Sequence, residues 1–218
     1  MVTEEDDLVL DFFAGSGTTA HSVYMANAAD GGNRKYIMVQ LDEPVPTGSP
    51  AVKSGFKSIS QISRERIRRA AEHVAGNAGM KDWDGGFRSF RVDSGNMTDT
   101  LREPDRVDQL DLSLFTSSVK EGRSAEDLLF QVLLDWGLEP SLSITKGVIG
   151  GREVFFVDED AVAACFADEL PPEVVREIAR RQPLRAVFRD DGFDSDAARI
   201  NAEQIFREVS PSTEVKAI

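Results

Sequence analysis

The 218-residue sequence is poor in the residues that build metal clusters and disulfide frameworks. It contains one cysteine, Cys165, and two histidines, which excludes an intrachain disulfide and a cysteine-rich zinc site. No apolar run approaches the roughly 20 residues that span a bilayer, and the opening MVTEEDD lacks the basic and apolar regions of a secretory signal. We therefore expect a cytoplasmic protein without a membrane association or a bound metal.

Positive charge is also scarce. The net charge is −13, with 38 Asp and Glu against 25 Lys and Arg, the reverse of what a chain needs to neutralise duplex phosphates by itself. Two interpretations stay open: an acidic surface suited to high salt, or a chain that does not touch nucleic acid. One stretch differs from the rest, because residues 56–92 hold eight Lys and Arg against four Asp and Glu.

The beginning of the sequence has the pattern of a parallel sheet. Residues 8–13 (LVLDFF) and 35–41 (KYIMVQL) are β-prone apolar runs of the kind that form buried strands. Residues 18–29 between them are good helix formers that stop near Gly31. Strand, glycine turn, helix and strand in this order predict a βαβ unit.

The next segments predict a loop, a helix and a short strand. Residues 44–55 are rich in proline and glycine, and residues 57–74 carry isoleucines at the spacing of an amphipathic helix. Residues 86–92 predict a strand. We take residues 1–92 as one domain and the polar residues 93–123 as a connector.

Residues 124–218 predict a small mixed α/β domain. A capping pair, Ser124 and Asp127, predicts a helix that runs to Trp136 and ends at Gly137. The elements expected after it are a hairpin of residues 141–149 and 153–158, a helix over 171–181, a strand over 185–189, a helix over 194–209 and a strand over 214–218. Asp190 and Asp191 precede a glycine, which favours a turn over an acid site.

One segment is chemically specific, DFFAGSGTTAH, which begins at Asp11. Its glycines, Gly15 and Gly17, follow a predicted strand and precede a predicted helix, where backbone can approach a ligand closely. No Gly-Lys-Ser/Thr follows, so this is not a phosphate-binding P-loop, and no third glycine completes the dinucleotide fingerprint. An acidic residue, an aromatic residue and a hydroxyl pair at these positions suit a ligand with an amino acid and a nucleoside but no phosphate.

These residues resemble a known family. DFFAGSGTT is similar to the S-adenosylmethionine motif of amino-methylating DNA methyltransferases, in particular the modification subunits of type III restriction-modification systems. The likeness continues through GGNRKYIMVQLDEP, RERIRRA and GFRSFRVDSGN, and then through IGGREVFFVDEDAVAACF and FRDDGFDSDAARINAEQIF. The resemblance implies a partial Rossmann-like methyltransferase sheet, followed by a small mixed α/β C-terminal domain, in an adenine-specific DNA methyltransferase.

The resemblance also assigns cofactor-binding residues. These are Asp11, Phe13, Ala14, Gly15, Ser16, Gly17, Thr18, Thr19, Gln40 and Asp42. The resemblance implies that Asp11 accepts hydrogen bonds from the ammonium of the methionine moiety. It also implies that Ser16, Thr18 and Thr19 bond the methionine carboxylate near a helix N-terminus. Many relatives have a carboxylate where Gln40 stands, so Asp42 or Glu43 is an alternative contact to the ribose. The resemblance places Phe13 against the sheet or the adenine.

The family's second motif, a polar residue followed by Pro-Pro-Tyr, does not occur in this sequence. In relatives this motif holds the extruded base, and it lies upstream of the glycine motif. We therefore expect the C-terminal portion of a modification subunit, with no catalytic residues and no methylation by this chain alone. Expected partners are the upstream methyltransferase portion or a restriction subunit, with DNA bound through the complete enzyme and oligomer formation left open.

Two alternatives stay open beside this hypothesis. The chain could be a docking module or remnant that binds an upstream or restriction subunit through residues 124–218, or a different nucleotide-binding enzyme. The arginines between Arg64 and Arg69 could contact phosphates, although a solvated helix face is the commoner explanation of a charge run. His21 is expected to be a partly exposed helix residue.

Overall fold

The computed structural model describes residues 3–78, 83–98 and 119–218. The chain divides into two compact units, residues 1–91 and residues 92–218. They are called unit 1 and unit 2.

Unit 1 contains the predicted βαβ arrangement. Strand β1 (Leu8–Asp11) and strand β2 (Lys35–Met38) are parallel neighbours, and helix α1 (Thr18–Asp30) connects them. The helix ends where the sequence indicates, because Gly31 adopts φ 78° and its amide donates to the carbonyl of Asn27. The strand, helix and strand predictions for these segments are confirmed, with strands shorter than expected.

The rest of unit 1 differs from the prediction in two places. Residues 44–55 include a one-turn helix, α2 (Pro50–Lys53), and the amphipathic helix α3 spans Ile59–Ala78. The expected strand over residues 86–92 is wrong, because no strand forms there. Phe87 packs on the core between α1 and α3 instead, and Arg64 donates to Ser89, so side chains of α3 hold this segment.

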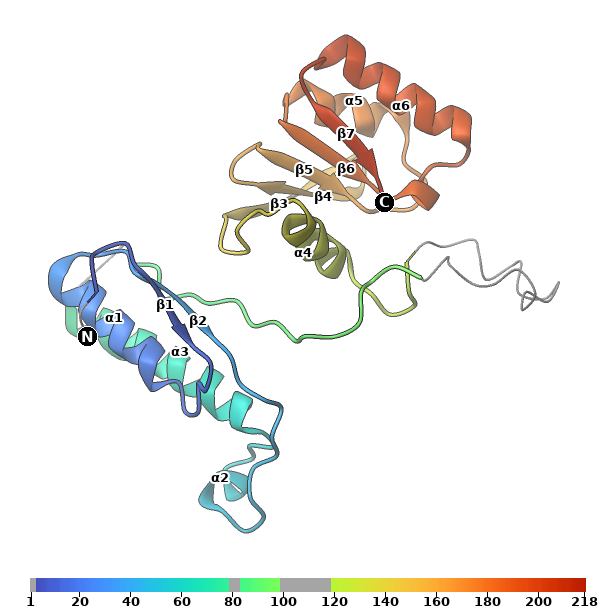
Figure 1. The fold of residues 1–218 in the computed structure, drawn as a ribbon. Coiled ribbons are helices and arrows are strands. Elements are labelled where there is room, and N and C mark those ends of the chain that lie inside the picture. Colours follow the sequence, from blue (N-terminus) through green and yellow to red (C-terminus); the bar gives the residue numbers. More distant parts are fainter. Residues whose placement is uncertain (1–2, 79–82, 99–118) are drawn as a thin grey trace. The chain divides into compact units, whose positions relative to one another are not determined.

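The core of unit 1 lies on one face of its two strands. Tyr24 from α1, Ile67 and Val74 from α3, and Tyr36 and Met38 from β2 pack together there, and Figure 1 shows both helices running beside the strand pair. The other face is exposed. Its apolar side chains are Leu8, Leu10, Phe12, Ile37, Val39 and Leu41, between 43% and 66% exposed. The expectation of fully buried strands is therefore wrong for this face.

Unit 2 is a five-stranded mixed sheet in the order β3-β4-β5-β6-β7. The strands are β3 (Ile144–Ile149), β4 (Arg152–Val157), β5 (Val162–Cys165), β6 (Arg185–Phe188) and β7 (Glu214–Ala217). The first two pairings are antiparallel and the last two are parallel. The β3–β4 hairpin, β6 and β7 are confirmed predictions, whereas β5 was not predicted, because the run AVAACF has no polar alternation and few β-branched residues.

Three helices cover the sheet of unit 2 on both faces. Helix α4 (Ala125–Asp135) packs against the side chains of Phe155 and Val187, and α5 (Pro172–Arg180) and α6 (Asp196–Val209) pack against the opposite face (Figure 1). The helix predictions for these segments are confirmed. A short 3-10 turn, Asp190–Gly192, follows β6 as expected.

The cysteine at the end of β5 belongs to this core. Cys165 is fully buried, and burial raises the pKa of its thiol. A thiol of this kind packs as a small apolar group.

No helix within the described residues combines the length and the hydrophobicity that a membrane span requires.

Helix α4 begins with the expected capping box. The Ser124 hydroxyl accepts from the Asp127 amide at 3.2 Å, and the Asp127 carboxylate accepts from the Ser124 amide at 2.8 Å. The Ser124 amide, followed by the Ser124 hydroxyl, which donates to the same carboxylate oxygen at 2.7 Å, holds the pKa of Asp127 below its ordinary value of 3.8.

We expect Ser124→Ala to lower the free energy of unfolding of unit 2 by about 1 kcal/mol, because it removes a cap. The ionised Asp127 carboxylate contributes to the free energy of unfolding, and this contribution is complete above the unfolded-state pKa of 3.8. It is lost as pH falls through the lowered pKa of Asp127 in the folded protein. Urea unfolding followed by Trp136 fluorescence in a Trp83→Phe background measures both effects. Ser141→Ala is the control, and an equal loss in that variant would contradict the capping role.

Candidate functional site

The candidate site is the loop between β1 and α1, residues 12–17, called the glycine loop below. Gly15 and Gly17 both adopt positive φ, at 52° and 77°, a conformation that other residues rarely adopt. Gly17 is also the N-cap residue of α1. The sequence therefore bends sharply here, and places the end of β1 beside the start of the helix.

Asp11 organises the first half of this bend. Its Oδ1 accepts from the Phe13 amide at 2.9 Å and its Oδ2 accepts from the Thr19 hydroxyl at 2.6 Å. The Thr19 hydrogen bond, followed by that from Phe13, lowers the pKa of Asp11. The side chain is thus a stable carboxylate at neutral pH, with lone pairs left for another donor.

The end of β2 holds the second half of the bend. Gln40 Oε1 accepts from the Gly15 amide at 2.8 Å, and the Val39 carbonyl accepts from the Ala14 amide at 3.0 Å. The amide side chain of Gln40 is therefore engaged by the glycine loop, with its Nε2 donating to the Leu41 carbonyl at 3.3 Å.

Helix α3 supports the loop from the side of the core. The Ser63 hydroxyl donates to the Gly15 carbonyl, and Ile67 packs beside Gly17. Sequence reasoning missed both residues. The sequence holds only a weak sign of their role, which is that Ser63 and Ile67 are four residues apart and so share one face of a helix. In the structure this face of α3 is buried.

The two glycines have different surroundings. A Cβ on Gly17 would lie 3.0 Å from Ile67 Cγ1 and 3.2 Å from the Ser63 carbonyl oxygen, so contact with α3 requires glycine there. A Cβ on Gly15 would meet only the Phe13 carbonyl oxygen, at 3.7 Å. Gly15 therefore faces open space and Gly17 faces the protein.

The start of α1 is polar, and the Asp11 carboxylate, outside the helix, bonds its second residue, Thr19. No side chain caps the helix, and its first turn contains no acidic residue. The hydroxyls of Ser16 and Thr18 lie 3.2 Å apart, and Arg66 Nη1 donates to the Ser16 hydroxyl at 2.8 Å. Free amides, hydroxyls and a guanidinium at one place are suited to an anion.

The remaining predicted residues lie at the edge of this arrangement. Phe13 is 85% exposed and Asp42 is exposed beyond the end of β2. The structure thus joins Asp11 to Thr19, and Gly15 to Gln40, by direct hydrogen bonds. It leaves Phe13 and Asp42 open to solvent.

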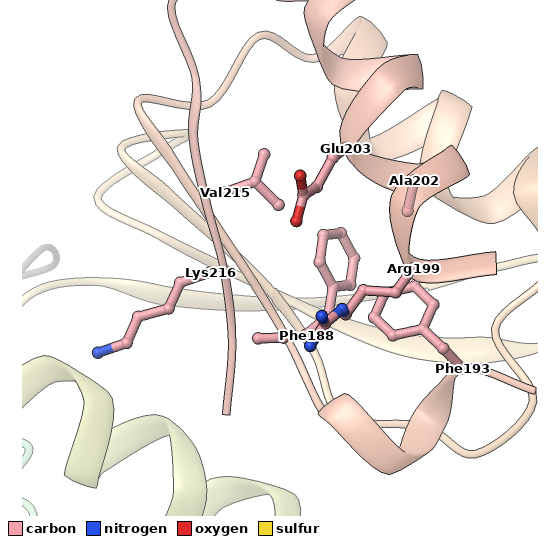
Figure 2. A pocket seen from close by; sticks show the side chains of 8 residues that line it. Phe188, Phe193, Arg199, Ala202, Glu203, Val215 and Lys216 are labelled. Atoms are coloured by element: carbon pink, nitrogen blue, oxygen red, sulfur yellow. The ribbon is translucent and has the colours of Figure 1, made fainter. Parts of the chain in front are cut away.

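Two hollows lie away from the glycine loop. One, of about 20 Å³, lies between β6, β7 and α6 in unit 2, and Figure 2 shows Arg199 and two phenylalanines around it. It has room for about one water molecule. The other, about 510 Å³ and open, is lined by residues of α3 and by Phe56 and Ser89.

The other residues considered in the sequence, His21, Asp190 and Asp191, belong neither to the glycine loop nor to the lining of the two hollows. His21 is partly exposed on α1, as expected. Asp190 and Asp191 form ion pairs with Arg199 and Arg189. The residues that the structure describes contain no group of three side chains able to hold a metal ion.

Part of the chain is homologous to DNA methyltransferases of restriction-modification systems, which confirms the resemblance found in the sequence. The chain is 39% identical over 113 residues to the type III restriction-modification enzyme StyLTI Mod subunit of Salmonella typhimurium, covering 52% of this chain. It is 40% identical over 87 residues, 40% of this chain, to the EcoP15I Mod subunit of Escherichia coli. It is 43% identical over 72 residues, 33% of this chain, to the type II methyltransferase M.KpnI of Klebsiella pneumoniae.

These matches span a small part of each relative: 17%, 12% and 17% of their lengths, respectively. No family model matches the chain.

The contact between Gly17 and α3 can be tested by substitution. We expect Gly17→Ala to destabilise unit 1 by about 2–4 kcal/mol, because it combines a left-handed conformation for alanine with an overpacked contact. Gly31→Ala is the matched control, since Gly31 has φ 78° and an added Cβ there would meet no atom within 4 Å. We expect a loss of about 1–2 kcal/mol in that variant.

Urea unfolding followed by Trp83 fluorescence in a Trp136→Phe background measures both variants. Equal losses in the two variants would show that the α3 contact contributes nothing.

Proposed function

We propose that the chain is the S-adenosylmethionine-binding, C-terminal part of a site-specific adenine DNA methyltransferase of the type III restriction-modification kind. The observation that carries this proposal is the glycine loop, with an ionised Asp11 at one end and an uncapped helix N-terminus at the other. Homology to Mod subunits and to a type II methyltransferase supports the same function.

The residues of the loop fit the amino-acid end of S-adenosylmethionine. Asp11 accepts hydrogen bonds from the α-ammonium with its remaining lone pairs, while Thr19 and Phe13 keep it ionised. Ser16 and Thr18 hydroxyls and the free amides of α1 bind the α-carboxylate. Gly15 leaves space for the cofactor to lie against the backbone.

The nucleoside end fits the residues that follow β2. Gln40 Oε1 is engaged by Gly15, so in this proposal the exposed Asp42 is the better acceptor for the ribose hydroxyls. Phe13, which projects into solvent, contacts the adenine. We propose a Rossmann-like methyltransferase sheet for unit 1, of which β1 and β2 are two strands, with domains at residues 1–92 and 124–218 joined by a connector.

Bound S-adenosylmethionine supplies an electrophilic methyl group, which the complete enzyme transfers to a base nitrogen. The residues of this chain hold and orient the cofactor, and the extruded base is held by the Pro-Pro-Tyr motif, which this sequence lacks. We therefore propose no methylation by this chain alone.

The charge of the two units favours DNA contact near unit 1. Residues 1–91 hold 12 Asp and Glu against 11 Lys and Arg, whereas residues 92–218 hold 26 against 14. A strongly acidic unit repels phosphates at low salt. In this proposal unit 2 serves contacts to protein, such as a restriction subunit.

Isothermal titration of the full chain tests the proposed site. We expect binding of S-adenosylmethionine and none of NAD, and we expect Gly15→Ala to weaken the former about tenfold, because its methyl group enters the space of the ligand. Gly31→Ala is the control, because it introduces the same kind of backbone strain outside the glycine loop. The affinity of this variant for S-adenosylmethionine should be unchanged. Absence of S-adenosylmethionine binding by the unaltered chain would overturn the proposal.

A second candidate function, docking to the rest of a methyltransferase, is favoured by the exposed face of β1 and β2. Parallel sheets are normally covered on both faces, yet here one face leaves Leu10 and Ile37 about half exposed. We propose that this face receives the part of a methyltransferase that contains the Pro-Pro-Tyr motif, on the same or another polypeptide. Cofactor binding and docking are compatible, because they use different surfaces of the strand pair.

Co-purification tests the docking surface. A co-expressed Mod segment with the Pro-Pro-Tyr motif should be retained by the tagged chain and lost with Leu10→Asp, because a carboxylate cannot be buried unpaired in an apolar interface. Val148→Asp is the control, at a strand residue of unit 2 that is 75% exposed. Retention by the Leu10→Asp chain would rule out this face as the docking surface.

A further inference from the structure

The arginines of α3 form one basic run in the sequence, but the structure gives them different partners. Arg68 and Arg69 both pair with Glu65, at 3.7 and 2.8 Å. Arg64 Nη1 donates to the Ser89 hydroxyl at 3.1 Å. These three residues are therefore used within α3 or between α3 and the segment that follows it.

Arg66 alone of these arginines donates to the glycine loop. Its Nη1 donates to the Ser16 hydroxyl at 2.8 Å. Within the described part of the chain, no carboxylate oxygen lies within the 4.0 Å of an ion pair from its guanidinium. Its side chain is partly buried, so its positive charge lacks an ion-pair partner among the described residues and is only partly screened by water.

The charges around the glycine loop are complementary to a zwitterion. Asp11 gives a stable carboxylate at the β1 side of the loop, and Arg66 gives a cation on Ser16, next to the start of α1. An α-amino acid carries an ammonium and a carboxylate on one carbon. The loop thus offers one charged partner for each group.

We infer that Arg66 binds the α-carboxylate of the cofactor, together with Ser16, Thr18 and the N-terminus of α1. This inference rests on the proposed function and adds a residue of α3 to that site. A guanidinium can donate two parallel hydrogen bonds to a carboxylate. Arg66 reaches Ser16 with one Nη atom, which leaves further N–H groups for the ligand.

A DNA phosphate is the competing anion for Arg66. The carboxylate is favoured because Arg66 faces the glycine loop, whereas Arg64 and Arg68 line the open hollow on α3, where a nucleic-acid backbone would have room. If Arg66 binds the carboxylate, its substitution weakens cofactor binding. If Arg66 binds a phosphate, its substitution weakens DNA binding.

The experiment compares two ligands on the full chain by isothermal titration. S-adenosylmethionine has the carboxylate, and decarboxylated S-adenosylmethionine keeps the ammonium and the sulfonium without it. We expect Arg66→Gln to weaken binding of the first about tenfold, the loss of one charged hydrogen bond, and to leave binding of the second within about twofold. Arg69→Gln is the matched control, because Arg69 lies on the same helix and pairs with Glu65; both affinities should stay unchanged.

The outcomes separate this inference from the proposed function. If the unaltered chain binds neither ligand, the proposed function fails and the inference fails with it. If the unaltered chain binds S-adenosylmethionine but Arg66→Gln weakens both ligands equally, or neither, the inference alone is overturned. Unchanged S-adenosylmethionine affinity with weakened retention on immobilised duplex DNA would assign Arg66 to phosphate instead.

Discussion

The packing of α3 against the glycine loop is the constraint on which the geometry of unit 1 depends. Gly17 has room for no side chain because Ile67 and the Ser63 carbonyl lie against it, and the Ser63 hydroxyl holds the Gly15 carbonyl. A loop fixed on its inner side by a helix can present its other side to a ligand without reorganising. Pre-organisation of this kind lowers the entropic cost of binding.

The sequence predicts the local features of both units well, because they depend on neighbouring residues. The turn at Gly31, the capping box at Ser124 and the hairpin around residues 150–151 each follow from a few adjacent side chains and from the conformational freedom of glycine. Asp11 likewise bonds residues only two and eight positions away.

Features that depend on distant residues were not predictable in the same way. The contact between Ser63 and Gly15 joins residues 48 positions apart, and nothing in either segment encodes the other. The expected strand over residues 86–92 failed because side chains of the helices bind that segment and no strand lies beside it. Strand β5 was missed because an apolar run without alternation predicts burial and not a particular element.

The units also differ in how completely each one buries its apolar residues. Unit 2 covers its sheet on both faces, as a self-sufficient domain does. Unit 1 covers one face of its strand pair and leaves apolar side chains of the other face, such as Leu8, Leu10 and Ile37, exposed to water. This uncovered face is the surface that we propose for docking to another part of a methyltransferase.

The burial of the lone cysteine has a practical consequence for spectroscopy. Cys165 is buried in the core of unit 2, where reagents do not reach it, and burial raises the pKa of its thiol, which disfavours the reactive thiolate. A cysteine introduced at an exposed position of unit 1 would thus be the preferred target of a maleimide dye in the folded chain. Conjugation at one chosen place therefore needs no removal of the native sulfur.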